Sequence, residues 1–213
     1  MLKTAGKVEW LSKGFRGGGF AILRRLLTVA QKVLGLKEIL AVIKDRRKQW
    51  RIPIGTAARG IFTMFVCRLG SLNALEGLRS SRFWQSWLET SLPSADRLGR
   101  IMAVTDPETV RAANRKIYDR LKRNKAIRPW FHGLFAPIVD GHENHATYNR
   151  HCAGCLERKI KTANGEKTQY YHRNVTALLL TPDFQLLLDA EPQVPGEDEV
   201  ATAMRLLERV LKN

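Results

Sequence analysis

The sequence predicts a protein in two parts: a basic all-helical domain over about residues 1–130, then an α/β domain of three strands and one helix over about 131–213. Apolar residues recur at helical spacing throughout the first part. Runs of aromatic and β-branched residues, typical of strands, appear only after Pro129. The charge divides in the same way, because residues 1–130 hold 27 Lys and Arg against 9 Asp and Glu, and the remainder holds 9 against 11.

Composition limits the function classes. A chain of 213 residues with 44% hydrophobic content has enough apolar surface to bury a core. The formal charge of +16 and a pI near 10.3 favour a polyanionic partner, either nucleic acid or an anionic membrane surface. Three cysteines do not form a disulfide framework and fit a reducing cytoplasm. Neither a signal peptide in residues 1–10 nor a membrane span is expected, so we predict a cytoplasmic protein. A nucleic-acid partner would make it nucleoid-associated.

The first part is predicted to consist of consecutive helices. The apolar spacing favours a pair of helices over residues 20–34 and 36–49, then helical stretches over 56–79, 82–88 and 93–104. Trp84 and Trp87 are spaced to share one helix face. The run Thr105-Asp106-Pro107-Glu108 reads as a capping box that starts a last helix, ending near Lys125.

Basic side chains on these helices are the candidate DNA contacts. A solvated charged face is the ordinary interpretation of any single basic helix, but the net charge of the whole first part favours phosphate binding. The candidate residues are Arg24, Arg25, Arg46, Arg47, Lys48, Arg97, Arg100, Arg111, Arg115 and Lys122.

Strands and one helix are expected in the second part. An apolar run over residues 134–139 ends at Asp140, and residues 168–181 and 184–188 complete a three-stranded meander. A final helix opens at residues 195–199, where acidic side chains suit the positive end of the helix dipole. Its buried stripe is predicted to contain Val200, Met204, Leu207 and Leu211.

Asp140 is the candidate catalytic residue, because a carboxylate at the end of a buried strand is well placed to bind a divalent cation. Taken with the sequence around it, the chain resembles the DDE insertion-sequence transposases, which have an RNase H-like catalytic core. The resemblance covers most of the chain from residue 92 onward and rests on the order and spacing of several short motifs. These are residues 92–98 (LPSADRL), 138–143 (IVDGHE), 165–173 (GEKTQYYHR), 187–192 (LLDAEP) and 195–199 (PGEDE).

The resemblance implies the first three strands and first helix of an RNase H-like core, with Asp140 as the first of three catalytic carboxylates. In that family Asp, Asp and Glu hold two Mg²⁺ or Mn²⁺ ions that cleave and transfer DNA strands. The second Asp and the Glu are expected beyond Asn213. Asp189 does not replace them, because two strand spacings put it roughly 9–10 Å from Asp140.

The implied partners are DNA, at the transposon terminal inverted repeats, and a second copy or the remaining transposase segment; no membrane partner is expected. The expected function is transposon-end binding, with strand cleavage when the rest of the core is present. A non-catalytic repressor of transposition and an inert remnant of a truncated gene are the alternatives.

A separate metal site is suggested by Cys152 and Cys155, which form a C-x2-C pair. Four histidines lie near the pair in sequence: His142, His145, His151 and His172. Thiolate and imidazole ligands suit Zn²⁺, although a structural zinc takes four of them. Two reduced thiols in a loop are the alternative interpretation. His172, beside two tyrosines, is otherwise expected to be an ordinary strand residue, and Cys67 a core residue.

Overall fold

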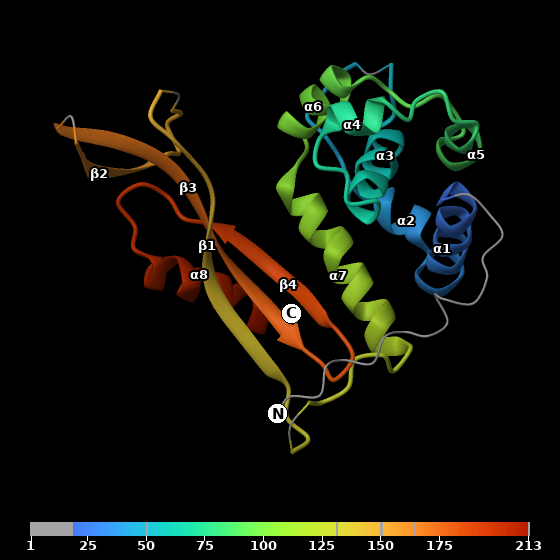
Figure 1. Cartoon of the computed structure of the whole chain (residues 1–213). Helices are drawn as coiled ribbons and strands as arrows, with labels where there is room; N and C mark the ends of the chain where they lie inside the picture. The colour runs from blue at the N-terminus through green and yellow to red at the C-terminus, as the bar shows by residue number, and fades with distance from the viewer. Residues whose placement is uncertain (1–18, 50, 131, 150, 164, 213) are drawn as a thin grey trace. The chain divides into compact units, whose positions relative to one another are not determined.

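The computed structural model describes residues 19–49, 51–130, 132–149, 151–163 and 165–212 (Figure 1). The chain divides into two compact units, one up to Ala113 and one from Asn114 onward. The first unit is helical and the second combines an antiparallel sheet with helices, so the expected mixture of helices and strands is confirmed at this level. Residues 1–10, where no signal peptide is expected, lie outside the described residues.

Short helices build the first unit around one apolar core. Their bounds are α1 Gly19–Leu34, α2 Leu36–Leu40, α3 Ile54–Val66, α4 Leu72–Glu76, α5 Phe83–Leu88 and α6 Ala95–Ala103, followed by α7 Pro107–Arg123, which crosses into the second unit. Trp84 and Trp87 are both buried. Their indole N–H groups donate to the carbonyl of Leu78 at 2.8 Å and to the hydroxyl of Thr63 at 2.9 Å. Each indole therefore buries a large apolar surface without leaving its polar atom unsatisfied.

Two of the predicted helices are shorter than expected. The helix over residues 36–49 ends at Leu40, because the chain beyond it pairs with the segment before α7: Asp45 forms a β-bridge to Thr105, and the amide of Arg46 donates to the carbonyl of Val104. The stretch over 56–79 is broken after Val66. Arg68 there takes a left-handed conformation with φ 53°, which an α-helix cannot continue.

The predicted capping box at residues 105–108 does not form. The Thr105 hydroxyl donates to the carbonyl of Ile101, in the preceding helix, rather than capping α7. Asp106 takes the capping role, and its carboxylate accepts the amide of Glu108 at 3.1 Å. Pro107 is the first residue of α7, a position at which its fixed φ and missing N–H cost nothing. The helix start is where the sequence predicts it, with a different capping side chain.

The second unit is built on a four-stranded antiparallel sheet within the described residues. The strands are β1 Ala136–Thr147, β2 Leu156–Thr162, β3 Gly165–Leu180 and β4 Gln185–Pro192. The long strand β3 pairs with β1 along one edge, and with β2 and then β4 along the other (Figure 1). The sequence predicts β1, β3 and β4 but not β2, since only two of the seven residues of β2 (LERKIKT) are apolar and they do not alternate with the charged ones.

Helix α8, Glu199–Leu211, packs on one face of this sheet. Its capping residue is Asp198, which accepts the amide of Ala201 at 2.7 Å, in agreement with the predicted acidic start. The fully buried side chain of Leu206 packs with Val175 and Ala177 of β3. These three residues form the centre of the sheet unit's core.

The buried stripe predicted for α8 is wrong. Val200, Met204 and Leu211 are 70%, 55% and 81% exposed, and Leu207 is half-buried. The residues packed against the sheet are Thr202, Ala203, Leu206 and Val210. The buried face carries the fully buried Leu206, and on the same side Arg205 and Arg209 bind acidic residues of β4.

Candidate functional site

Asp140 lies inside strand β1, not at its carboxyl end as the sequence predicts. The polar run after Asp140 looks unlike a strand, yet β3 is long enough to pair with all of it, from His142 opposite Asn174 to Thr147 opposite Tyr170. The strand is therefore determined by its partner rather than by its own apolar residues. The Asp140 side chain is exposed.

Asp140 occupies the sheet face opposite α8. Its neighbour Gly141 lies against α8, because a Cβ added at Gly141 would overlap the Glu199 carboxylate, which accepts a hydrogen bond from Arg173 at 2.8 Å. Successive strand residues point to opposite faces. The Asp140 carboxylate is thus presented on the face that α8 leaves uncovered, beside its cross-strand neighbour Thr176.

Asp189 and Glu191 lie on the other face of the sheet from Asp140. Asp189 is opposite Ala177 in the register, and its carboxylate binds Arg209 of α8 at 2.5 Å. Glu191 binds Arg205 at 3.0 Å. These acidic residues attach α8 to the sheet, which agrees with the expectation that Asp189 does not join Asp140. Among the described residues, Asp140 belongs to no cluster of three or more metal-binding side chains.

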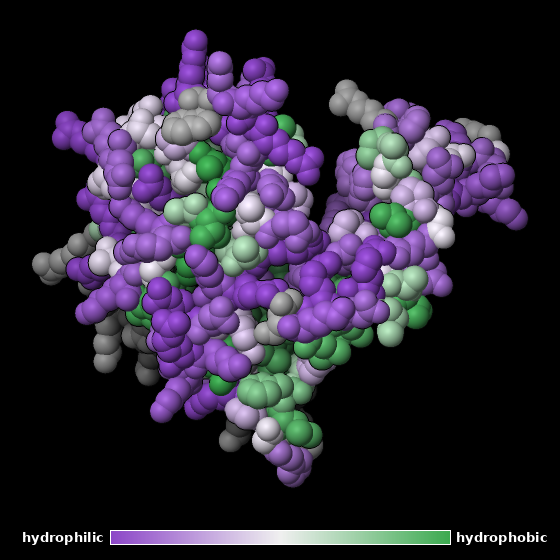
Figure 2. Space-filling view, turned by 180° about the vertical axis from the view of Figure 1, so that it is seen from behind, coloured by the Kyte–Doolittle hydropathy of each residue, from purple (hydrophilic) through white to green (hydrophobic). Residues whose placement is uncertain are grey.

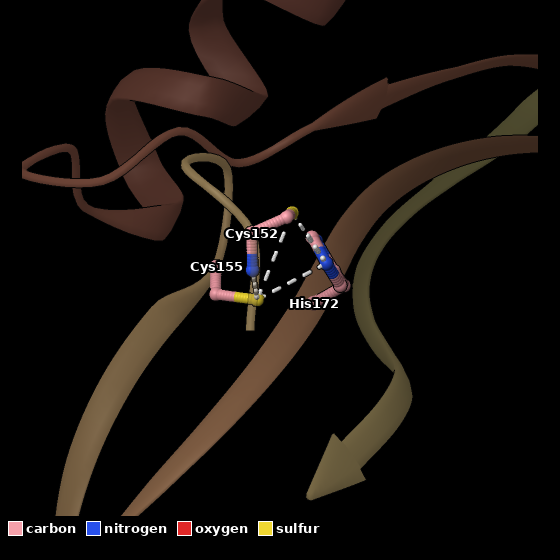
Figure 3. A group of neighbouring side chains, drawn as sticks. All are labelled: Cys152, Cys155 and His172. Atoms are coloured by element: carbon pink, nitrogen blue, oxygen red, sulfur yellow. Dashed lines mark hydrogen bonds between the residues drawn. The ribbon is translucent and has the colours of Figure 1, made fainter. Parts of the chain in front are cut away.

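A second group of chemically active residues lies where the β1–β2 connection meets β3. The Sγ atoms of Cys152 and Cys155 are 3.8 Å apart, and each lies close to Nε2 of His172, at 3.5 Å and 3.4 Å (Figure 3). The amide of Cys152 also donates to Sγ of Cys155 at 3.2 Å. These three side chains converge on one point and could hold a metal ion.

The structure thus selects one of the four histidines that the sequence offers as ligands. His172 joins the cysteines from β3, and His142, His145 and His151 do not belong to the cluster. His145 lies opposite His172 in the β1–β3 pair, and His151 stacks on Tyr170 with ring centroids 4.4 Å apart. The expectation that His172 is a strand residue holds, but it does not exclude a ligand role. Cys67, predicted to lie in the core, is exposed, although partial burial raises the pKa of its thiol.

The predicted DNA contacts are exposed with two exceptions. Arg24, Arg25, Arg46, Lys48, Arg97, Arg100, Arg115 and Lys122 have exposed side chains. Arg47 is half-buried, binding the Asp45 carboxylate at 2.5 Å and the carbonyl of Ile52 at 3.0 Å. Arg111 is also half-buried and pairs with Glu108. Hydrophilic side chains cover much of the face seen in Figure 2, with apolar patches between them.

A basic groove in the first unit adds residues that the sequence analysis missed. It has a volume of about 450 Å³ and lies between α1 and α5, with Lys32 and Lys37 beside the predicted contact Arg24. Lys37 also binds Glu89 at 2.7 Å, and this ion pair lowers the pKa of the Glu89 carboxyl. Lys32 could have been selected from its position two turns after Arg24 and Arg25 on the same helix. Lys37 could not, because only the packing of α2 brings it to the groove.

Comparison of the chain with protein-family models, curated proteins and solved structures gives no match. Among the described residues, no helix is both long and apolar enough to span a bilayer.

Proposed function

We propose that this protein binds DNA and forms the front part of a DDE transposase with an RNase H-like core. One observation carries the proposal: strands β1, β3 and β4 form an antiparallel meander with α8 on one face and the exposed Asp140 on the other. The order strand, strand, strand, helix is the one that the resemblance implies. Strand β2, between the first and second strands of that plan, is an addition to it.

The cofactor in this proposal is Mg²⁺ or Mn²⁺, which prefer carboxylate oxygens. Asp140 would supply one such oxygen ligand. A pair of ions needs further carboxylates around the same pocket, and among the described residues Asp140 is in no group of three or more metal-binding side chains. No catalytic step is therefore assigned to the residues described here.

DNA binding rests on the basic first part of the chain. Its exposed Arg and Lys side chains are suited to phosphate contacts. Arg24, Lys32 and Lys37 line one groove, together with the apolar side chains of Leu27, Phe83 and Trp87. The DNA expected is the transposon terminal inverted repeat. Repression of transposition is the second candidate function, because binding needs only the basic residues and Asp140 belongs to no group of three metal-binding side chains in the described part of the chain.

The test is binding of the full chain to a fluorescently labelled duplex at a series of salt concentrations. The affinity should fall by roughly 0.9 log units per log unit of salt for each phosphate neutralised. The double variant Arg97→Ala, Arg100→Ala should weaken binding and reduce the salt slope by roughly one unit for each phosphate that is no longer neutralised. Arg79→Ala, which removes an exposed charge outside the predicted set, is the matched control. A chain that binds anionic vesicles but no duplex at low salt would overturn the proposal.

Cleavage separates transposase from repressor. The discriminating assay uses this chain joined to a segment that supplies the rest of the core. Nicking of the same duplex by the joined chain in Mg²⁺ or Mn²⁺, abolished by Asp140→Asn with unchanged DNA affinity, would identify the transposase. Binding without nicking by the joined chain would identify the repressor. Nicking that survives the Asp140→Asn change would show that Asp140 has no role in it.

A further inference from the structure

We propose that Cys152, Cys155 and His172 bind one Zn²⁺ ion with three protein ligands, and that its fourth coordination position is open to water. This site is separate from Asp140, which pairs with a different part of β3: Asp140 lies opposite Thr176, whereas His172 lies opposite His145. The proposal does not depend on DNA binding.

The spacing of the three ligand atoms matches tetrahedral zinc. With Zn–S distances of about 2.3 Å and Zn–N distances of about 2.0–2.1 Å, a tetrahedral centre places two sulfurs about 3.8 Å apart and each sulfur about 3.5 Å from the nitrogen. The observed Sγ–Sγ distance is 3.8 Å, and the two Sγ–Nε2 distances are 3.5 and 3.4 Å. All three edges of one tetrahedral face therefore have the required lengths.

A disulfide does not account for this arrangement. Bonded sulfurs lie about 2.05 Å apart, well below the distance between Cys152 and Cys155, and both thiols are free. Two thiols in an ordinary loop are not expected to lie against the same nitrogen of one imidazole. The backbone amide of Cys152 donates to Sγ of Cys155, an interaction that stabilises a thiolate. Two thiolates and an imidazole favour Zn²⁺ over Mg²⁺ or Mn²⁺, which prefer oxygen ligands.

The ion would tie the β1–β2 connection to the central strand. Cys155 directly precedes Leu156, the first residue of β2, which is buried and lies opposite Tyr171. His172 follows Tyr171 on β3, so metal binding would hold the start of β2 in register. This connection has few apolar side chains to fix its position. Bonds from the metal to its ligands would stabilise it in place of hydrophobic packing.

The fourth vertex has no ligand among the described residues. The nearest histidines in sequence and register are His145 and His151, and neither has a ring nitrogen in the cluster. His151 is held against Tyr170 by ring stacking. Cys152 is exposed, so solvent reaches this side of the cluster. Three protein ligands with one open position are the arrangement in which zinc keeps a bound water.

The first measurement is the zinc content of the full chain. The protein is purified without added metal and is then dialysed against limiting Zn²⁺. One zinc per chain is expected, and Cys152→Ser, Cys155→Ser and His172→Ala should each lose it. His145→Ala, His151→Ala and Cys67→Ser should retain it. A wild-type content near zero after reconstitution overturns the site, and loss of zinc in His145→Ala or His151→Ala overturns the open fourth position.

Thiol alkylation tests the site without a variant, so misfolding of a mutant cannot hide the answer. Bound zinc should slow iodoacetamide labelling of Cys152 and Cys155 by about tenfold or more, because the metal occupies the thiolate lone pairs that attack the reagent. A chelator should restore the rate, and Cys67 labels as the internal reference in both states. Equal labelling with and without zinc would refute the proposal. In the Co²⁺-substituted chain, added thiocyanate should shift the visible ligand-field bands, and bands that do not respond would refute the open position.

Discussion

Replacement of Leu206 by Ala tests the observed orientation of α8, which differs from the one the sequence predicts. Leu206 is 0% exposed and packs against Val175 and Ala177 of β3, so the change removes buried methyl groups and leaves a cavity. A fully buried Leu→Ala change costs about 2–5 kcal/mol. We expect about 3 kcal/mol here, because the small residues around the site give the core little side chain with which to fill the space.

Met204→Ala is the matched control, since it lies on the same helix and was predicted to be buried. Its side chain is 55% exposed, and exposed substitutions change stability by about 0.5 kcal/mol or less. Ala is a strong helix former at both positions, so helix propensity does not favour one variant over the other. The difference between the two variants therefore reports burial alone.

Hydrogen exchange on peptides from β3 and α8 of the full chain measures the effect within the sheet unit. A loss of about 3 kcal/mol should speed exchange of the most protected amides by roughly 100-fold, as each 1.4 kcal/mol is a factor of ten. Met204→Ala should leave those amides almost unchanged. If Met204→Ala speeds exchange more than Leu206→Ala, α8 presents the face that the sequence predicts and the observed packing is wrong.

Three further substitutions, one of them measured over a pH series, test other residues. The hydrogen bond from Arg47 holds the pKa of the Asp45 carboxyl below its usual value, so the unfolded chain takes up the proton more readily than the folded one. The stability that Asp45 contributes is therefore present above about pH 4 and is lost as the pH falls further. Asp45→Asn should flatten this acidic part of a curve of melting temperature against pH. Trp87→Phe leaves the Thr63 hydroxyl without its indole donor and should cost about 1–2 kcal/mol in urea unfolding, whereas an unchanged midpoint would show that this hydrogen bond is not formed. Asp140→Asn should not lower the melting temperature, because the carboxylate is exposed; a clear loss would give it a structural role.

Much of the helical unit was predictable because its signals are local. The starts of α5, α6 and α7 follow from apolar spacing and from Pro and Ser positions within a few residues. The ends of α2 and α3 were not predictable in this way. α2 ends at Leu40, a few residues before residues 44–46 pair with residues 104–106, and no local pattern encodes a partner so distant in sequence.

The candidate metal sites also combine residues that local sequence shows with contacts that only the fold provides. The C-x2-C pair was visible in the sequence, but four nearby histidines were equally available as ligands. The pairing of β2 and β1 with β3 is what brings His172, rather than another histidine, to the two thiols. Asp140 was identified by its sequence context, whereas its mid-strand position and exposed face depend on β3.

The sequence by itself determined the order of helices first and strands later, the one-sided charge and the residues with metal-binding chemistry, because these depend on composition and on patterns within one or two turns. Only the tertiary structure decided which face of α8 is buried and which histidine meets the cysteines. An amphipathic pattern leaves more than one stripe of α8 apolar enough to bury. The face observed against the sheet packs Leu206 on Val175 and Ala177 and pairs Arg205 and Arg209 with acidic residues of β4. Contacts between residues far apart in the chain make that choice, and no local pattern contains them.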